Sequence, residues 1–193
     1  SVVIAEEAVA DKLLAAFARE GAYVLKDEER DAIRNTVFPE GHFNIKMVGK
    51  DAVWIAEQAG IKVPAKTRVL VAPFDLVVPE EPFAHEKLCP VLGFVRVPSA
   101  DRGIDVARAI LRITGSGHSA AIHSASPELI MKFSAAVPVL RVSVNVGNSL
   151  GASGIQTNLP PTMTIGTGYA GRSSVPRRNH LCPDCLLRRH LYI

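Results

Sequence analysis

From residue 91 onward, short apolar runs alternate with segments of helical periodicity, and this alternation restricts the fold more than any other feature of the sequence. The apolar runs cover residues 91–97, 118–123 and 141–146. Between them lie a helical pattern over residues 101–114 and a helix start at Ser126-Pro127-Glu128, which supplies an N-cap, a proline and an acid in turn. Strands connected by helices in this way run parallel and are joined by right-handed crossovers. The sequence therefore predicts an α/β fold with a mostly parallel sheet and flanking helices.

The first ninety residues predict three helices and one short strand. The helices are expected at residues 9–20, 27–37 and 51–60, and the strand at residues 68–72. Gly21 is a suitable stop for the first helix, and Asp51 is a good N-cap for the third. Glycines and prolines interrupt the chain beyond Gly147, which predicts loops with one short strand near residues 163–165.

Length and composition exclude several classes of protein. A chain of 193 residues with 48% hydrophobic and 21% charged residues fits one soluble domain or part of a larger protein. The net charge of +3 is concentrated in residues 171–193, which hold five arginines and one acid, so the body of the chain offers no footprint for nucleic acid. No apolar run has the length of a membrane span, and the chain begins without a secretory signal and without Met. Three cysteines, an odd number, favour a reducing cytoplasmic setting.

Two motifs near the end of the chain are weak indicators of function. Residues 166–171 match the G-x-G-x-x-G dinucleotide fingerprint, but the residues that follow lack helical periodicity, so we reject the match. Cys182 and Cys185, with His180 and His190 nearby, could supply four zinc ligands. A single C-x-x-C is a weak signal, and we predict no metal site.

The segment from Pro82 to Phe94 places the charged cluster His85-Glu86-Lys87 directly before an apolar strand. Charged side chains at the mouth of a strand are costly to bury without a partner, so we expect this cluster to serve a ligand. Cys89 could be a nucleophile, but a small buried residue at the strand entry is the favoured interpretation. His118 follows a glycine-rich bend, where a ligand can approach the backbone closely, and is a candidate site residue.

Residues 82–90 resemble the CoA-acylating branch of the aldehyde dehydrogenase superfamily, including the aldehyde half of bifunctional aldehyde–alcohol dehydrogenases. Glu86-Lys87-Leu88-Cys89-Pro90 is similar to the Glu-x-x-x-Pro segment of the superfamily. Further similarities run in order along the chain: Val48-Gly49-Lys50, Ile55-Ala56 with Ala59-Gly60 and Val63-Pro64, Gly115 with Gly117-His118-Ser119, and Gly166, Gly168, Gly171 and Ser173. The resemblance covers residues 1–175 and implies an aldehyde dehydrogenase catalytic-domain-like fold there, followed by a divergent basic tail, 176–193.

The resemblance also implies a reaction and a site. A catalytic cysteine attacks a small aldehyde, hydride passes to NAD or NADP, and coenzyme A, the co-substrate, takes the acyl group from the resulting thioester. Glu86 matches a glutamate that hydrogen-bonds the nicotinamide ribose, and Leu88 matches a residue that packs near the cofactor. His118 matches a histidine near the active site, which would help to position the thioester or CoA. Members commonly form dimers or larger assemblies, so a homo-oligomer is expected.

The sequence departs from the family at both ends. The nucleophilic cysteine of the family lies a few residues upstream of the position that Ser1 matches and is absent, as is most of the nucleotide-binding domain. The resemblance thus implies the catalytic-domain portion alone, without dehydrogenase activity in isolation. A non-catalytic module that retains the fold for assembly or regulation is a second hypothesis. A third, less favoured, is a non-acylating enzyme, which needs a general base upstream of the missing cysteine.

Overall fold

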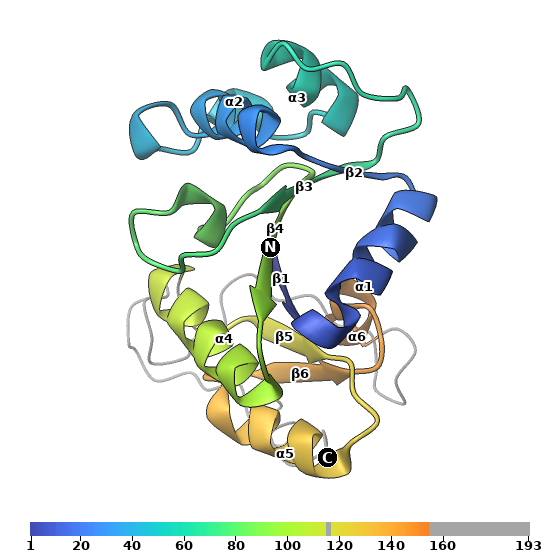
Figure 1. Cartoon of the computed structure of the whole chain (residues 1–193). Helices are drawn as coiled ribbons and strands as arrows, with labels where there is room; N and C mark the ends of the chain where they lie inside the picture. Colours follow the sequence, from blue (N-terminus) through green and yellow to red (C-terminus); the bar gives the residue numbers. More distant parts are fainter. Residues whose placement is uncertain (115–116, 155–193) are drawn as a thin grey trace. The chain divides into compact units, whose positions relative to one another are not determined.

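The computed structural model describes residues 1–114 and 117–154 of the chain (Figure 1). The chain divides into two compact units, Ser1–Thr114 and Gly115–Ile193. Among the described residues, no helix has both the length and the apolar character that crossing a membrane requires.

The first unit is built on a four-stranded, wholly parallel sheet with the strand order β1-β4-β3-β2. Its strands are β1 (Val2–Glu6), β2 (Ala22–Val24), β3 (Val69–Pro73) and β4 (Val91–Val97). Its α-helices are α1 (Glu7–Arg19), α2 (Asp27–Val37), α3 (Ala52–Gln58) and α4 (Ala100–Thr114). Three short 3-10 helices complete it: η1 (Pro39–Gly41), η2 (Ile45–Met47) and η3 (Pro82–Ala84).

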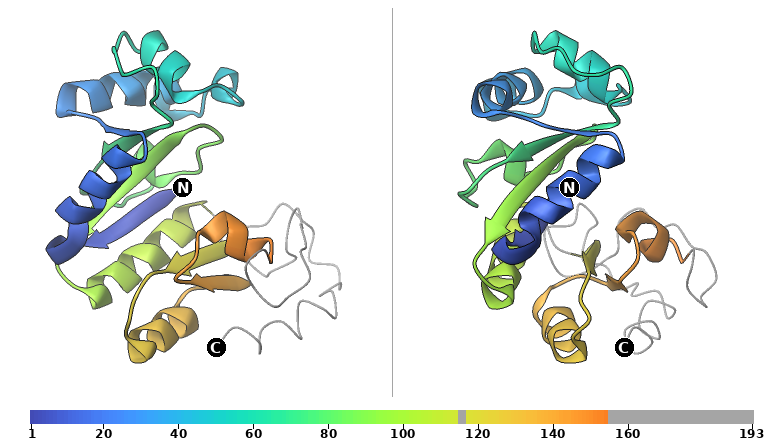
Figure 2. Two further views of the ribbon diagram at one scale, coloured as in Figure 1. Left: turned by 90° about the vertical axis from the view of Figure 1, so that its right-hand side faces the viewer. Right: turned by 45° about the vertical axis from the view of Figure 1, so that its right-hand side comes forward.

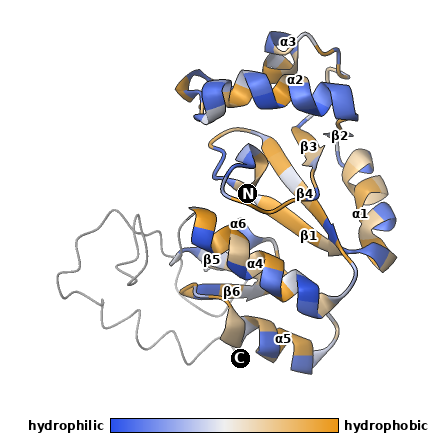
Figure 3. Cartoon of the chain, turned by 60° about the vertical axis from the view of Figure 1, so that its left-hand side comes forward, coloured by the Kyte–Doolittle hydropathy of each residue, from blue (hydrophilic) through white to orange (hydrophobic). Residues whose placement is uncertain are grey.

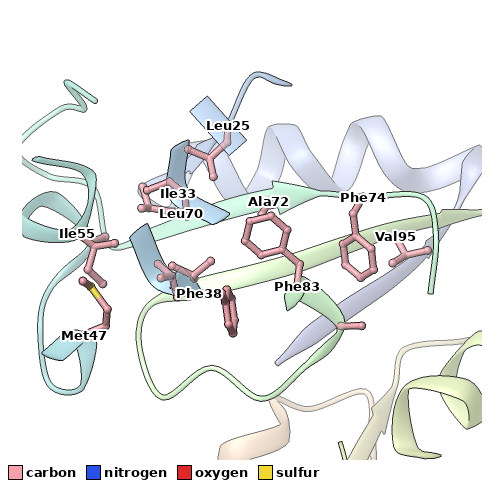
Figure 4. Packing of buried hydrophobic residues seen from close by; sticks show 14 of the residues in the cluster. Leu25, Ile33, Phe38, Met47, Ile55, Leu70, Ala72, Phe74, Phe83 and Val95 are labelled. Carbon is pink, nitrogen blue, oxygen red and sulfur yellow. The ribbon is translucent and has the colours of Figure 1, made fainter. Parts of the chain in front are cut away.

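Helices cover both faces of this sheet because successive strand residues point to opposite sides. Val71 and Phe94 pack with Ala10 of α1 on one face. Figure 2 shows α1 lying along this face of the sheet. Leu70 and Val95 belong to the larger cluster on the other face, which α2, α3, α4 and η3 complete (Figure 4). Because both faces of the sheet are covered, its strands are mostly hydrophobic, as Figure 3 shows. Helix α2 is largely hydrophilic.

Local signals explain most of the predicted helices. The helix expected at residues 27–37 is observed as α2 with the same bounds. A side-chain oxygen of Asp51 accepts a hydrogen bond from the backbone nitrogen of Trp54 at 2.8 Å and caps α3 as predicted. Gly21 follows α1 with a φ of 93°, a conformation that glycine adopts without strain. The strands β1 and β2 were not predicted, because both are short and β1 runs directly into α1.

The second unit contains β5 (Ser119–Ile122), α5 (Pro127–Ala136), β6 (Arg141–Val144) and α6 (Asn148–Ala152). The strands β5 and β6 pair in parallel, and α5 connects them. The predicted N-cap is observed, because the Ser126 hydroxyl accepts a hydrogen bond from the backbone nitrogen of Leu129. Helix α6 was not predicted. The strand expected near residues 163–165 lies outside the described residues.

The predicted fold class is confirmed: parallel sheets carry flanking helices in an α/β arrangement. One connection differs from the expectation. In the described part of the chain, β4 pairs with β1 and β3, whereas β5 pairs only with β6. The helix α4 therefore does not join two strands of one sheet there. Periodicity identifies strands and their direction, but it does not say which strand lies beside which.

Candidate functional site

The segment that carries Glu86 connects η3 to β4. Because β1, β3 and β4 are parallel, it lies at the amino-terminal edge of the sheet. This edge is opposite the carboxyl ends of the strands, where open α/β sheets usually hold their ligands. The hydrogen bond from the Gly93 backbone nitrogen to the carbonyl oxygen of Ser1 shows that β1 begins at the same edge.

Side chains from α2 and from the preceding loop fasten η3. One carboxylate oxygen of Glu81 accepts a hydrogen bond from the backbone nitrogen of Phe83 at 2.9 Å, and the other binds the Arg34 guanidinium at 3.0 Å. The same guanidinium lies 5.0 Å from the centre of the Phe83 ring, in a cation–π contact. His85 Nε2 is 2.6 Å from the carbonyl oxygen of Pro79 and closes the loop.

Phe83 anchors the segment in the core. Its ring is fully buried, with ring centres 6.2 Å from Phe38 and 6.5 Å from Phe74 (Figure 4). Gly93 of β4 lies close to the backbone of Phe83. A Cβ atom added at Gly93 would lie 2.8 Å from the carbonyl oxygen of Phe83. Only glycine allows the strand and η3 to approach this closely.

Lys87, not Glu86, is the buried charge of the cluster. Only 6% of Lys87 is exposed. Its Nζ atom donates hydrogen bonds to the carbonyl oxygens of Phe83 at 2.6 Å and His85 at 2.7 Å. Burial lowers the pKa of Lys87 to about 8. The sequence predicted that burying a charged side chain directly before β4 would cost free energy. The buried charge there is that of Lys87.

Glu86 and Leu88, the two predicted cofactor-binding residues, are exposed on either side of Lys87. Leu88 is 57% exposed. The segment thus presents a carboxylate and an apolar side chain to the outside, two residues apart. A carboxylate accepts hydrogen bonds from hydroxyl groups, and an apolar side chain covers a ring, so the pair can contact a polar ligand that carries a ring.

Cys89 behaves as a packing residue. It is half-buried and packs against the larger core cluster. Burial raises the pKa of its thiol, which disfavours the thiolate that a nucleophile needs. These observations agree with the interpretation favoured from the sequence.

His118, the predicted catalytic residue, lies in the second unit. It is exposed and directly precedes β5. The chain bends at the glycine before His118, as predicted. Gly117 has a φ of 104°, and its backbone nitrogen donates a hydrogen bond to the carbonyl oxygen of Pro138 at 3.0 Å. Glu86 and Leu88 therefore belong to one segment of the first unit, and His118 belongs to the second unit, at the start of its two-stranded sheet.

The predicted features of the tail lie outside the described residues. This applies to the rejected fingerprint at residues 166–171, to Cys182 and Cys185, and to the basic tail, 176–193. Within residues 1–114 and 117–154, no group of three or more histidine, cysteine, aspartate or glutamate side chains could hold a metal ion.

Similarity to curated proteins covers most of the chain. The aldehyde-alcohol dehydrogenase of Clostridium acetobutylicum is 38% identical over 178 residues, which cover 90% of this chain and 21% of that protein. The succinate-semialdehyde dehydrogenase (acetylating) of Clostridium kluyveri is 34% identical over 174 residues, covering 90% of this chain and 38% of that protein. The chain thus spans well under half the length of either relative. A scan against protein-family models finds no match.

Solved structures agree with the sequence matches. An acetylating aldehyde dehydrogenase from Geobacillus thermoglucosidasius superposes with a TM-score of 0.83 at 33% identity, over 90% of this chain and 38% of that one. An engineered glycolyl-CoA reductase with bound NADP+ gives 0.73 at 29% identity, over 85% and 36% of the two chains. The propionaldehyde dehydrogenase of Rhodopseudomonas palustris with bound propionyl-CoA gives 0.72 at 28% identity, over the same shares.

The parallel α/β fold and these matches define the class of protein that the chain is similar to: α/β oxidoreductases. More particularly, it is homologous to one part of the CoA-acylating aldehyde dehydrogenases, since acylating enzymes match 90% of it in both sequence and structure. The resemblance inferred from residues 82–90 is confirmed.

Proposed function

We propose that the chain supplies part of the catalytic unit of a CoA-acylating aldehyde dehydrogenase. Such an enzyme converts a small aldehyde, coenzyme A and NAD or NADP to acyl-CoA and the reduced cofactor. The observation that carries the proposal is the exposed Glu86–Leu88 pair, fastened at one edge of a sheet that superposes on acetylating dehydrogenases. The chain covers only a fraction of its relatives' length, so the complete reaction would need further parts of the protein.

The described residues fit the role of a cofactor-binding edge. Glu86 is exposed, and an ionised carboxylate can only accept hydrogen bonds, which matches the hydroxyl donors of a nicotinamide ribose. Leu88 offers an apolar surface beside it. When bound, the nicotinamide would supply the hydride acceptor. The role of Glu86 and Leu88 is to hold and orient that group.

His118 has a separate role in the proposal. Its exposed imidazole at the start of β5 could donate a hydrogen bond to an acyl or CoA group. The covalent step needs a thiolate, and burial disfavours that form of Cys89. We therefore assign the nucleophile to the cysteine that the family carries upstream of the position of Ser1.

Partners and location follow from the same reasoning. We propose a cytoplasmic enzyme that acts on small molecules, binds neither nucleic acid nor membrane, and forms a homo-oligomer like its family. Light scattering tests the last point: a mass of one chain at all concentrations would contradict it.

Binding of the reduced cofactor tests the proposed site. We would titrate NADH into the 193-residue chain and record saturation-transfer difference NMR, which detects weak binding. Transfer to the ribose and nicotinamide protons is expected, and Glu86→Gln should weaken binding about tenfold, because hydrogen bonds to charged groups contribute about 1.5–3 kcal/mol. Glu80→Gln, at a nearby exposed glutamate, is the matched control. A chain that binds no NADH, or equal binding by wild type and Glu86→Gln, would contradict the site and favour a non-catalytic module.

A further inference from the structure

The buried ammonium group of Lys87 has no place in the proposed chemistry, yet its burial is costly. A methionine of similar length could fill the same space without desolvating a charge. Both hydrogen-bond acceptors of Nζ are neutral backbone carbonyls, those of Phe83 and His85. Four charged or ionisable groups also act on Lys87: Ser1, Glu81, Glu86 and Cys89. Its position is thus explained by neither packing nor a salt bridge.

The two carbonyl contacts link residues 83, 85 and 87 across one turn of chain. Residues before this point have other fastenings, since Glu81 and Arg34 hold η3 and His85 contacts Pro79. Residues after it join the sheet at Val91. Within the described part of the chain, no backbone nitrogen of residues 86–88 donates a hydrogen bond. The hydrogen bonds of Lys87 therefore tie residues 86–88 to the fold, between η3 on one side and the packed side chain of Cys89 on the other.

We propose that Lys87 is a positioning residue whose ammonium group clamps the carbonyls of Phe83 and His85 and so fixes Glu86 and Leu88 toward the cofactor. Lys87 is buried while its neighbours Glu86 and Leu88 are exposed, so a clamp that holds Lys87 inward keeps both neighbours on the outside. The inference rests on the proposed function for its cofactor. The clamp itself is a property of the loop and can be tested alone.

The clamp tolerates changes of protonation. At neutral pH the pKa of Lys87 leaves most of the group as ammonium, with three donors. The neutral amine retains two N–H donors, enough for both carbonyls. Removal of the donors, rather than of the charge, is therefore the decisive change.

Lys87→Met removes the donors and keeps the length of the side chain, and Lys62→Met, at an exposed lysine, is the matched control. We would measure backbone order parameters by NMR relaxation and NADH binding by saturation transfer on the same samples. In Lys87→Met the order parameters of residues 86–88 should fall from about 0.85 to below about 0.6, while those of β3 and β4 stay unchanged. NADH binding should weaken at least about fivefold, whereas Lys62→Met should resemble wild type in both measurements.

The outcomes separate this inference from the proposed function. Unchanged order parameters in Lys87→Met overturn the clamp. If residues 86–88 become mobile in Lys87→Met but NADH still binds as tightly as to wild type, the positioning role is overturned. If Glu86→Gln binds as wild type does, the proposed cofactor site fails, and the relaxation data still decide the clamp. If Lys87→Met does not fold, the clamp is tested on the wild-type chain by the rate at which the Nζ protons of Lys87 exchange with water. Exchange as fast as at Lys62 overturns the proposal, and slower exchange supports it.

Discussion

Lys87 makes the stability of the fold depend on pH above neutrality. Burial lowers the pKa of its ammonium group to about 8, against an ordinary value of 10.5 in the unfolded chain. Below pH 8 the group is charged in both states, and the full cost of burying the charge is present. Between the two pKa values the unfolded chain binds more protons, so the free energy of unfolding rises with pH. The whole gain is at most about 3 kcal/mol.

Urea unfolding of wild type and Lys87→Met at pH 8, 9 and 10.5 measures this effect. The buried thiol of Cys89 and the Tyr23 hydroxyl, which donates to Glu29, both have raised pKa values and act in the opposite direction. Both remain in the variant, so the difference between the two proteins reports Lys87 together with its effect on Cys89, whose pKa the charge of Lys87 lowers. The stability of wild type should rise relative to the variant over this range; a constant or falling difference would contradict the assignment.

Gly93 leaves no room for a side chain. In Gly93→Ala the new Cβ would lie 2.8 Å from the carbonyl oxygen of Phe83 and 2.9 Å from a ring carbon of Phe74. Relieving this overlap must displace η3, so we expect a loss of about 1–3 kcal/mol in the free energy of unfolding. Gly103→Ala is the control, because its Cβ would meet Val97 at 3.5 Å, an ordinary contact. Within α4, that change should stabilise by up to about 1 kcal/mol.

Two residues of the candidate site, Glu86 and Leu88, were predicted from the sequence because they match a family motif. It did not reveal that Lys87 is buried, because the two carbonyls that bind it come from the path of the loop. Arg34 was missed for the same reason: nothing in α2 marks it as a partner of Glu81 and Phe83. Glu81 alone had a local signal, since the proline that follows it is typical of the first position of a helix.

At the scale of elements, prediction succeeded where capping and periodicity act locally. The bounds of α2 and β4 were predicted as observed, because acids and an apolar run define them in the sequence. The strand β2 has three residues, too few for a periodic pattern, and β1 runs directly into α1 with no turn residue to mark its end. Their pairing with β3 and β4 makes them strands. In the described residues, the pairing of β5 with β6 rather than with β4 likewise depends on tertiary contacts.

Helix α3 depends on its cap. It has seven residues, too few to be stable on its own, and Asp51 satisfies one of its free backbone donors. Asp51→Ala should lower the free energy of unfolding by about 1 kcal/mol. Asp51→Asn retains an acceptor oxygen and should cost less. Thermal unfolding of the three proteins tests this, and equal stability of Asp51→Ala and wild type would show that the cap contributes nothing.

At the scale of the whole molecule, we expect the proposed reaction to need residues beyond the matched segment. The matched segment covers 21% of the Clostridium acetobutylicum relative and 38% of the Clostridium kluyveri one. The described residues contain one cysteine, Cys89, and burial raises the pKa of its thiol. The chain expressed alone should therefore form no NADH from an aldehyde, CoA and NAD, even if it binds NADH weakly.

The measurement is absorbance of NADH with several small aldehydes, because the substrate pocket is not defined by the described residues. The full-length Clostridium kluyveri enzyme, assayed with succinate semialdehyde, is the positive control. Formation of NADH by the isolated chain would contradict the assignment of the nucleophile upstream of Ser1. Cys89→Ser would then identify the source: loss of that activity would show that the half-buried thiol reacts despite its raised pKa. If Cys89→Ser retained the activity, Cys182 and Cys185 would be the remaining candidate nucleophiles.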